Sequence, residues 1–118
     1  MNEAHGIEIV ERDVNVSVEE LGSDLACAII QQPNFLGEVR DLTTLADRVH
    51  AQGAILIEVF DPISLGLLKS PGELDVDIAI GEGQSLGIPM SFGGPYCGLF
   101  ATKEKYVRQM PGRLAGMA

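Results

Sequence analysis

Hydrophobic residues fall into short continuous runs along the chain, and polar segments separate these runs. The runs lie at Gly6–Val10, Leu25–Ile30, 54–60, Val76–Ile80 and 97–102. Apolar runs of this length, bounded by turn-forming residues, are typical of strands. A continuous rather than alternating apolar pattern favours strands that are buried on both faces of a parallel sheet. We therefore expect a mainly parallel sheet.

Helices are predicted between these runs. The clearest is Asp41–Gln52, with Asp41 as N-cap and Gly53 as the C′ glycine that ends it. Its apolar positions recur at i, i+3, i+4 and i+7 and form one stripe: Leu42, Leu45, Ala46 and Val49. Shorter helices are expected at Ser17–Leu21, which has a capping box, and near Lys103–Gln109.

Strands that alternate with helices predict an α/β fold with helices flanking a mainly parallel sheet. The connection Asp61–Asp75 shows no strong helical pattern, and the last twenty residues are rich in glycine and proline. We therefore expect residues 1–118 to form a single α/β segment of a larger domain.

Composition narrows the possible functions. The chain carries 8 basic and 17 acidic residues, a formal net charge of −9, which argues against nucleic acid or an anionic membrane as a partner. No apolar run approaches the roughly 18 residues of a membrane span. The acidic N-terminal stretch lacks the features of a signal peptide. Cys27 and Cys97 lack metal-ligand spacing, so we expect reduced thiols and a cytoplasmic location.

The glycines at 81, 83 and 87 follow a strand, as in a phosphate-binding loop. The dinucleotide fingerprint would need its third glycine at position 86, where the chain has Leu86. The prolines of "IPMSFGGP" also oppose the helix that would hold a phosphate. Two interpretations remain open: a wide connection whose glycines adopt positive φ, or a loop whose backbone is approached closely near Gln84.

The motifs "GQSLGIPMSFGGP" and "MPGRLAG", with "QQPNFLGEVRDL" upstream, closely resemble the P-protein family of the glycine cleavage system. Within that family the chain is most similar to subunit 1 (alpha) of the two-subunit form of glycine dehydrogenase (decarboxylating). The resemblance implies an internal piece of the large domain of a fold-type I transferase dependent on pyridoxal phosphate. It also implies an oligomer with subunit 2 (beta) and a lipoyl H-protein as partners.

The resemblance assigns possible roles to several residues. Gln84 occupies the position of the Schiff-base lysine, and an amide cannot form an internal aldimine, so no catalytic residue and no covalent cofactor are expected here. Asp61 lies at a strand end where this fold places an aspartate against the pyridine nitrogen, although the residues themselves favour a turn residue before proline. Gly93, Gly94 and Arg113 are candidates for substrate or loop contacts. No metal site is predicted.

Two functions from different classes follow. In the first, the chain is a structural part of the alpha subunit of a complex that decarboxylates glycine and transfers the aminomethyl group to the lipoyl group of H-protein. The chain alone would then be inactive, and it would pair with the catalytic subunit and line the entrance for the lipoyl arm. In the second, the chain is a free-standing α/β module that binds a small anion with the loop Gly81–Gly98.

Overall fold

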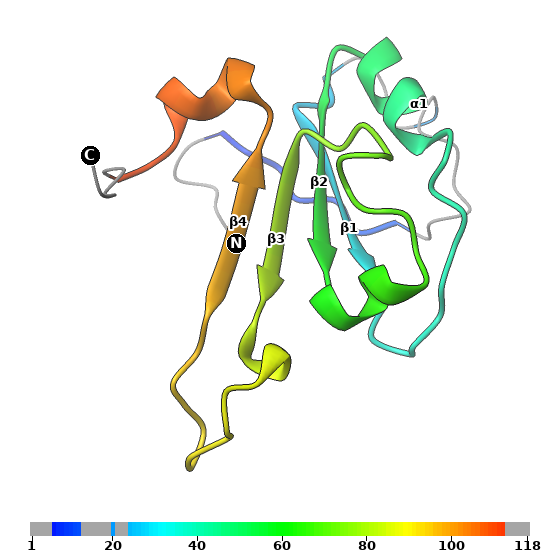
Figure 1. Cartoon of the computed structure of the whole chain (residues 1–118). Coiled ribbons are helices and arrows are strands. Elements are labelled where there is room, and N and C mark those ends of the chain that lie inside the picture. Colours follow the sequence, from blue (N-terminus) through cyan, green and yellow to red (C-terminus); the bar gives the residue numbers. More distant parts are fainter. Residues whose placement is uncertain (1–5, 13–19, 21–23, 113–118) are drawn as a thin grey trace.

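The computed structural model of the chain describes residues 6–12, 20 and 24–112, and these contain a four-stranded sheet. The strands lie side by side in chain order: β1 (Cys27–Gln32), β2 (Ile55–Phe60), β3 (Ile78–Glu82) and β4 (Gly98–Thr102). β1, β2 and β3 are parallel, and β4 runs antiparallel to β3 (Figure 1). The predicted α/β fold with a mainly parallel sheet is therefore confirmed.

The helical segments are short. α1 (Leu45–Ala51) connects β1 to β2, and within residues 24–112 there are also three 3-10 helices: η3 (Pro62–Gly66), η4 (Gln84–Leu86) and η5 (Glu104–Gln109). The connection 61–75 contains only η3, as its weak helical pattern predicts. The short helix expected near Lys103–Gln109 is η5.

α1 begins later than the predicted start at Asp41. The Asp41 carboxylate accepts a hydrogen bond from the N–H of Thr43 at 2.9 Å, so it closes a local turn, and Thr44 occupies the N-cap position. The predicted end is confirmed, since Gly53 has a φ of +75° just after the C-cap residue Gln52.

Two further expectations about the N-terminal part need correction. Gly6–Val10 is not a strand, and no described segment pairs with it. β1 is displaced by two residues from the predicted run and ends at Gln32, because Pro33 has no N–H to donate. The helix predicted at Ser17–Leu21 falls largely outside the described residues and stays a prediction.

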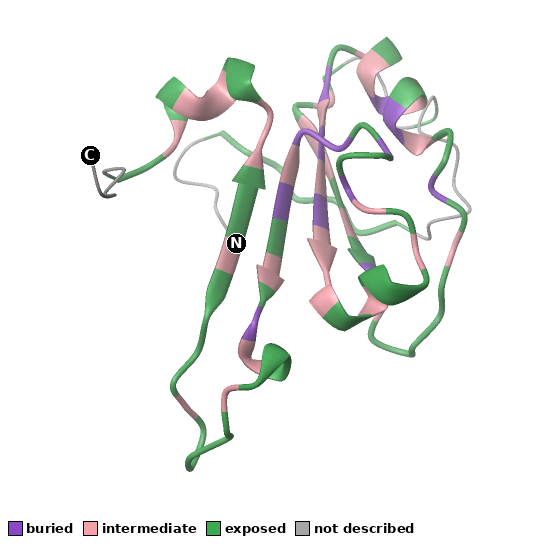
Figure 2. Cartoon of the chain, viewed as in Figure 1, coloured by how far each residue is buried: buried purple, intermediate pink, exposed green. Residues whose placement is uncertain are grey.

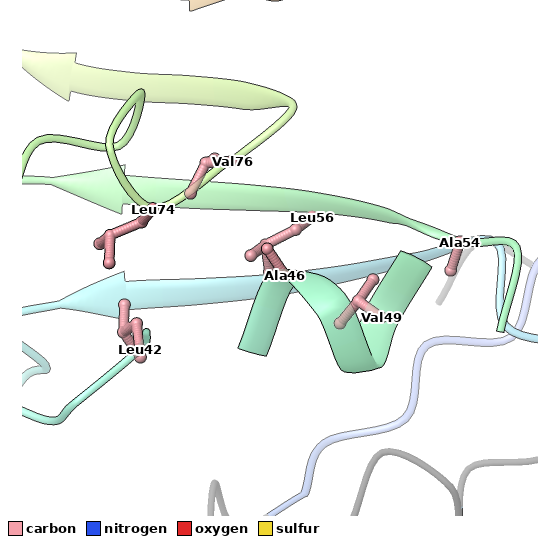
Figure 3. Close-up of a cluster of buried hydrophobic side chains, with 7 residues drawn as sticks. All are labelled: Leu42, Ala46, Val49, Ala54, Leu56, Leu74 and Val76. Carbon is pink, nitrogen blue, oxygen red and sulfur yellow. The ribbon is translucent and has the colours of Figure 1, made fainter. Parts of the chain in front are cut away.

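One face of the sheet carries the core. Figure 3 shows α1 lying across β1 and β2, with Leu56 of β2 close to Ala46 and Val49 of the helix. The buried cluster consists of Leu42, Ala46, Val49, Ala54, Leu56, Leu74 and Val76. Leu45, Ala46 and Val49 of the predicted apolar stripe thus form the face of α1 that packs on the sheet, and Leu42, which precedes α1, joins the same core.

The opposite face of the sheet is apolar but open. The register aligns Ile29 with Ile57 and Ile78, and Val59 with Ile80 and Phe100. Ile29 is 67% exposed, and Ile80 and Phe100 are also exposed. Within the described residues, burial on both faces is therefore wrong for β1 (Figure 2). Among the described residues, α1 and the part of the β2–β3 connection that contains Leu74 and Val76 cover one face of the sheet.

A buried aspartate joins several elements at the amino edge of the sheet. Asp77 accepts hydrogen bonds from the N–H of Leu56 at 2.9 Å and from His50 Nε2, which lies 2.6 Å away. Lys103 and Lys105 place their ammonium groups 3.1 and 3.3 Å from its other oxygen. Burial alone would raise the pKa of Asp77, but these hydrogen bonds and charges hold it well below its usual range.

Candidate functional site at the carboxyl edge of the sheet

The carboxyl ends of β1, β2 and β3 meet at the edge where open α/β sheets bind ligands. A pocket of about 390 Å³ opens there. Its lining residues come from the ends of the three parallel strands: Gln31, Gln32, Pro33, Val59, Phe60, Asp61, Ile80, Gly81 and Glu82. Both ionisable residues of this lining, Asp61 and Glu82, are acidic, so the lining supplies no cation for a phosphate.

Asp61 lies at the end of β2, as predicted, and its observed role is that of a turn residue. Its carboxylate accepts a hydrogen bond from the N–H of Ile63 at 3.0 Å and thereby caps η3. Its backbone carbonyl accepts a hydrogen bond from the Ser64 hydroxyl at 2.6 Å. The contact of Asp61 with a cofactor stays a prediction.

Gln84 begins η4 directly after β3, on the same edge as Asp61, and η3 and η4 contact each other. The Gln84 residue is half-buried, and its side-chain nitrogen is buried without a hydrogen-bond partner among the described residues. The structure thus places Gln84 beside the pocket edge. It does not test whether Gln84 contacts a cofactor.

The first two glycines of the loop are explained by close packing. A Cβ atom at Gly81 would lie 2.9 Å from the carbonyl oxygen of Phe60, closer than real Cβ atoms approach. A Cβ atom at Gly83 would lie 3.1 Å from the carbonyl oxygen of Cys97. Both neighbours are backbone atoms of adjacent segments, so the close approach anticipated from the sequence is made by the protein itself.

Several backbone N–H groups of the loop that could hold an anion donate within the protein instead. Gly83 N–H donates to the Cys97 carbonyl at 2.7 Å. The carboxylate of Glu82 accepts from the N–H groups of Gln84 and Cys97, at 3.0 and 2.7 Å. Farther on, Gly87 N–H donates to the Gln84 carbonyl. A loop folded around its own carboxylate is a poor phosphate cradle.

Sequence reasoning missed Glu82, which organises this loop. Its only sequence signal is an acidic residue at the end of an apolar strand, directly before Gly83. Such a position is usually interpreted as solvent-exposed, and Glu82 is indeed exposed although its carboxylate holds two N–H groups.

The lysines of the described chain do not lie at this edge in a way that fits a Schiff base. Lys103 and Lys105 follow β4, whose end aligns with the start of β3, so both belong to the opposite edge with Asp77. Lys69 lies in the connection between β2 and β3 and is not among the residues that line the pocket. The residues of the described site therefore do not fit a covalently held pyridoxal phosphate.

The remaining candidates are dispersed. Gly93 and Gly94 lie in the connection from β3 to β4 and do not line the pocket, and Arg113 lies outside the described residues. His50 belongs to the network around Asp77. The described part of the chain contains no cluster of three or more residues suited to a metal ion, and none of its helices could span a membrane.

Comparison with known proteins agrees on one family. A profile of the Glycine cleavage system P-protein matches residues 1–118. The probable glycine dehydrogenase (decarboxylating) subunit 1 of Desulforamulus reducens is 53% identical over 98 residues, covering 83% of this chain and 22% of that protein. The protein of the same name from Geotalea daltonii is 48% identical over 118 residues, covering 94% of this chain and 27% of that protein.

A solved structure is also similar. It is a crystal structure of glycine decarboxylase (P-protein) of the glycine cleavage system in inhibitor-bound form, with a TM-score of 0.74 and 53% identity. The match covers 79% of this chain and 21% of that chain. The chain thus spans 22 to 27% of the length of the curated relatives described above. Because the family profile matches residues 1–118, the chain belongs to the P-protein family of the glycine cleavage system.

Proposed function

We propose that this chain is a non-catalytic, structural part of subunit 1 of a glycine decarboxylase P-protein. The complex as a whole decarboxylates glycine and transfers the aminomethyl group to the lipoyl group of H-protein. Residues 1–118 would form one segment of the large domain of that subunit, because the chain spans only 22 to 27% of relatives that bear the name.

One observation carries the non-catalytic assignment: Gln84 begins η4 at the carboxyl edge, where the family resemblance expects a Schiff-base lysine. A carboxamide has no nucleophilic amine. Lys103 and Lys105, in addition, pair with Asp77 at the opposite edge. Pyridoxal phosphate would therefore be held covalently by subunit 2, and this chain would have a structural role in the complex.

The expected partners rest on the family resemblance, and the expected location rests on the composition of the chain. The partners would be subunit 2 and the lipoyl H-protein in an oligomer, and the location would be cytoplasmic. The alternative of a free-standing module for a small anion is weaker, because the loop N–H groups already donate within the protein and Glu82 places a negative charge among them.

Reconstitution tests this function. The full-length subunit that contains this chain is assayed alone, then with subunit 2, using release of labelled carbon dioxide from carboxyl-labelled glycine in the presence of H-protein and pyridoxal phosphate. We expect no release from either subunit alone and sustained release from the pair. Activity of subunit 1 by itself would contradict a non-catalytic role. If the two subunits together released no carbon dioxide, the assignment of this chain to a glycine decarboxylase complex would be contradicted.

A further inference from the structure

We propose that the open face of the sheet packs against helices from the remaining length of subunit 1, and that these helices connect strands beyond the free edge of β1. The open face consists of six side chains that the register aligns: Ile29, Ile57, Val59, Ile78, Ile80 and Phe100. This inference rests on the proposed function, and it specifies a surface of this chain that is internal to the subunit.

The open face has the chemistry of a protein core. All of its side chains except Phe100 are β-branched and aliphatic, and none of the six is charged. The covered face, in contrast, contains the buried Glu58. Large apolar side chains that lie together on a protein surface mark a packing or interaction site. Water is therefore not the native environment of the open face.

The two faces differ in exposure although the sequence treats them alike. Leu56 on the covered face is buried, whereas on the open face Ile29 is 67% exposed and Phe100 is 47% exposed (Figure 2). The continuous apolar runs that include β1 and β2 are the pattern of strands buried on both faces. The described residues supply the cover of one face, and the cover of the other face comes from outside them.

The order of the strands indicates that the same polypeptide supplies this cover. β1, β2 and β3 are parallel and follow one another in one direction across the sheet (Figure 1). Because connections between parallel strands are right-handed, those that run in this direction all lie on one face. α1 and the β2–β3 connection pack together around Leu56 accordingly. Helices on the opposite face belong to connections that run the other way, toward strands beyond β1.

The free edge of β1 is suited to a further strand. Among the described residues β1 pairs only with β2, so its other edge faces no described strand. Edge strands that stay unpaired in proteins are commonly protected by charged side chains or by proline within the strand. The sequence of β1, CAIIQQ, contains neither. A parallel strand of the same subunit can therefore pair with this edge.

Two other occupants fit the open face less well. A second copy of this chain would bring together two segments of formal charge −9, which repel each other at long range. Subunit 2 would have to replace connecting helices, although mainly parallel sheets are covered on both faces by the helices that connect their own strands. The chain spans 22 to 27% of its relatives, so most of a subunit of that length is available to supply such helices.

The first test measures denaturant unfolding of full-length subunit 1 without subunit 2. Phe100→Asp places a charge on the open face, and Phe100→Leu is the matched control that keeps the position apolar. We expect Phe100→Asp to lower the denaturation midpoint at least about three times as much as Phe100→Leu, because a buried unpaired charge costs more than a lost apolar contact. Equal shifts, or a larger shift for Phe100→Asp that appears only with subunit 2 present, overturn the inference.

A photo-crosslinking residue in place of Phe100 gives a readout that does not depend on the aspartate variant folding. Isotope-labelled and unlabelled copies of subunit 1 are mixed with subunit 2, irradiated and digested. We expect crosslinks within one copy of subunit 1, to residues outside this chain. Crosslinks to subunit 2, between two copies of subunit 1, only within residues 1–118, or none at all overturn the inference.

The proposed function fails in a different way. If it is wrong, the unmodified pair of subunits releases no carbon dioxide from glycine, whatever covers the sheet. If only the packing of the open face is wrong, the unmodified pair keeps this activity while the crosslinks fall elsewhere. The two failures are therefore told apart by assaying the unmodified pair beside the crosslinked one.

Discussion

Replacing Asp77 with asparagine is expected to lower the free energy of unfolding by about 3 kcal/mol, as for one partner removed from a buried ion pair. The asparagine keeps an oxygen for the N–H of Leu56, but its amide hydrogens would face Lys103 and Lys105. The charge that holds His50 at 2.6 Å is also lost. Denaturant unfolding of the subunit that contains this chain measures the effect.

Asp75 supplies the matched control, because it pairs with the same Lys103 at 2.7 Å but is exposed. Exposed ion pairs contribute little to stability, so Asp75→Asn should leave the denaturation midpoint almost unchanged. If Asp77→Asn and Asp75→Asn lowered the denaturation midpoint equally, the larger stabilising role assigned to Asp77 would be wrong.

The pH dependence of this effect has a definite sign. The pKa of Asp77 is lowered from its usual 3.8, so its stabilisation is complete above that value and is lost as the pH falls below it. The difference between the native protein and Asp77→Asn should therefore be largest near neutral pH and shrink in acid.

Replacing Glu58 with methionine is expected to stabilise the protein by about 1–2 kcal/mol near pH 8, the kind of gain seen when a buried ionic group is replaced by an apolar one. Glu58 is 2% exposed on the core face of β2, and one of its carboxylate oxygens has no hydrogen-bond partner among the described residues. Methionine has a similar length and needs no partner. Thermal and denaturant unfolding measure the change, with exposed Glu104→Met as a control expected to have no effect.

The gain should depend on pH. Burial raises the pKa of Glu58 above the usual 4.5, so the folded protein binds a proton more tightly there than the unfolded chain does. The contribution of Glu58 to the free energy of unfolding is therefore complete below pH 4.5 and is lost as the pH rises through the pKa of the folded state. The Glu58→Met variant has no such group, so its stability should not fall in this way. A gain that did not grow with pH, or a loss of stability, would show that the rest of the subunit supplies a partner for Glu58.

Much of the fold follows from local pattern. The apolar stripe of α1 and the continuous run of β2 were predictable because burial of each dominates its local preference. β3 was predicted at Val76–Ile80 but spans Ile78–Glu82, because Asp77 is held in the network before the strand begins. The start of α1 was misplaced because the Asp41 carboxylate bonds to the next turn instead of a helix. Gly6–Val10 shows that β propensity without a partner strand does not make a strand.

The candidate site was less predictable. That position 84 carries glutamine and not lysine can be seen in the sequence, but its correspondence to the Schiff-base position rests on the family resemblance and stays a prediction. The roles of Glu82 and Asp77 could not be seen there, since each depends on groups brought together by strand pairing, such as Cys97 N–H and the Lys103 ammonium. The need for glycine at 81 and 83 likewise could not be predicted, because it comes from close contact with the backbones of Phe60 and Cys97, which lie elsewhere in the sequence.

The most direct test of the non-catalytic assignment is to map reduced pyridoxal phosphate. The two full-length subunits are mixed with the cofactor, absorbance is followed between about 330 and 430 nm, as expected for free and bound cofactor forms, and the mixture is reduced with borohydride and digested. We predict that every stoichiometric pyridoxyl-lysine peptide comes from subunit 2. A stoichiometric adduct at Lys69, Lys103 or Lys105 would contradict the account, because this chain would then hold the cofactor itself.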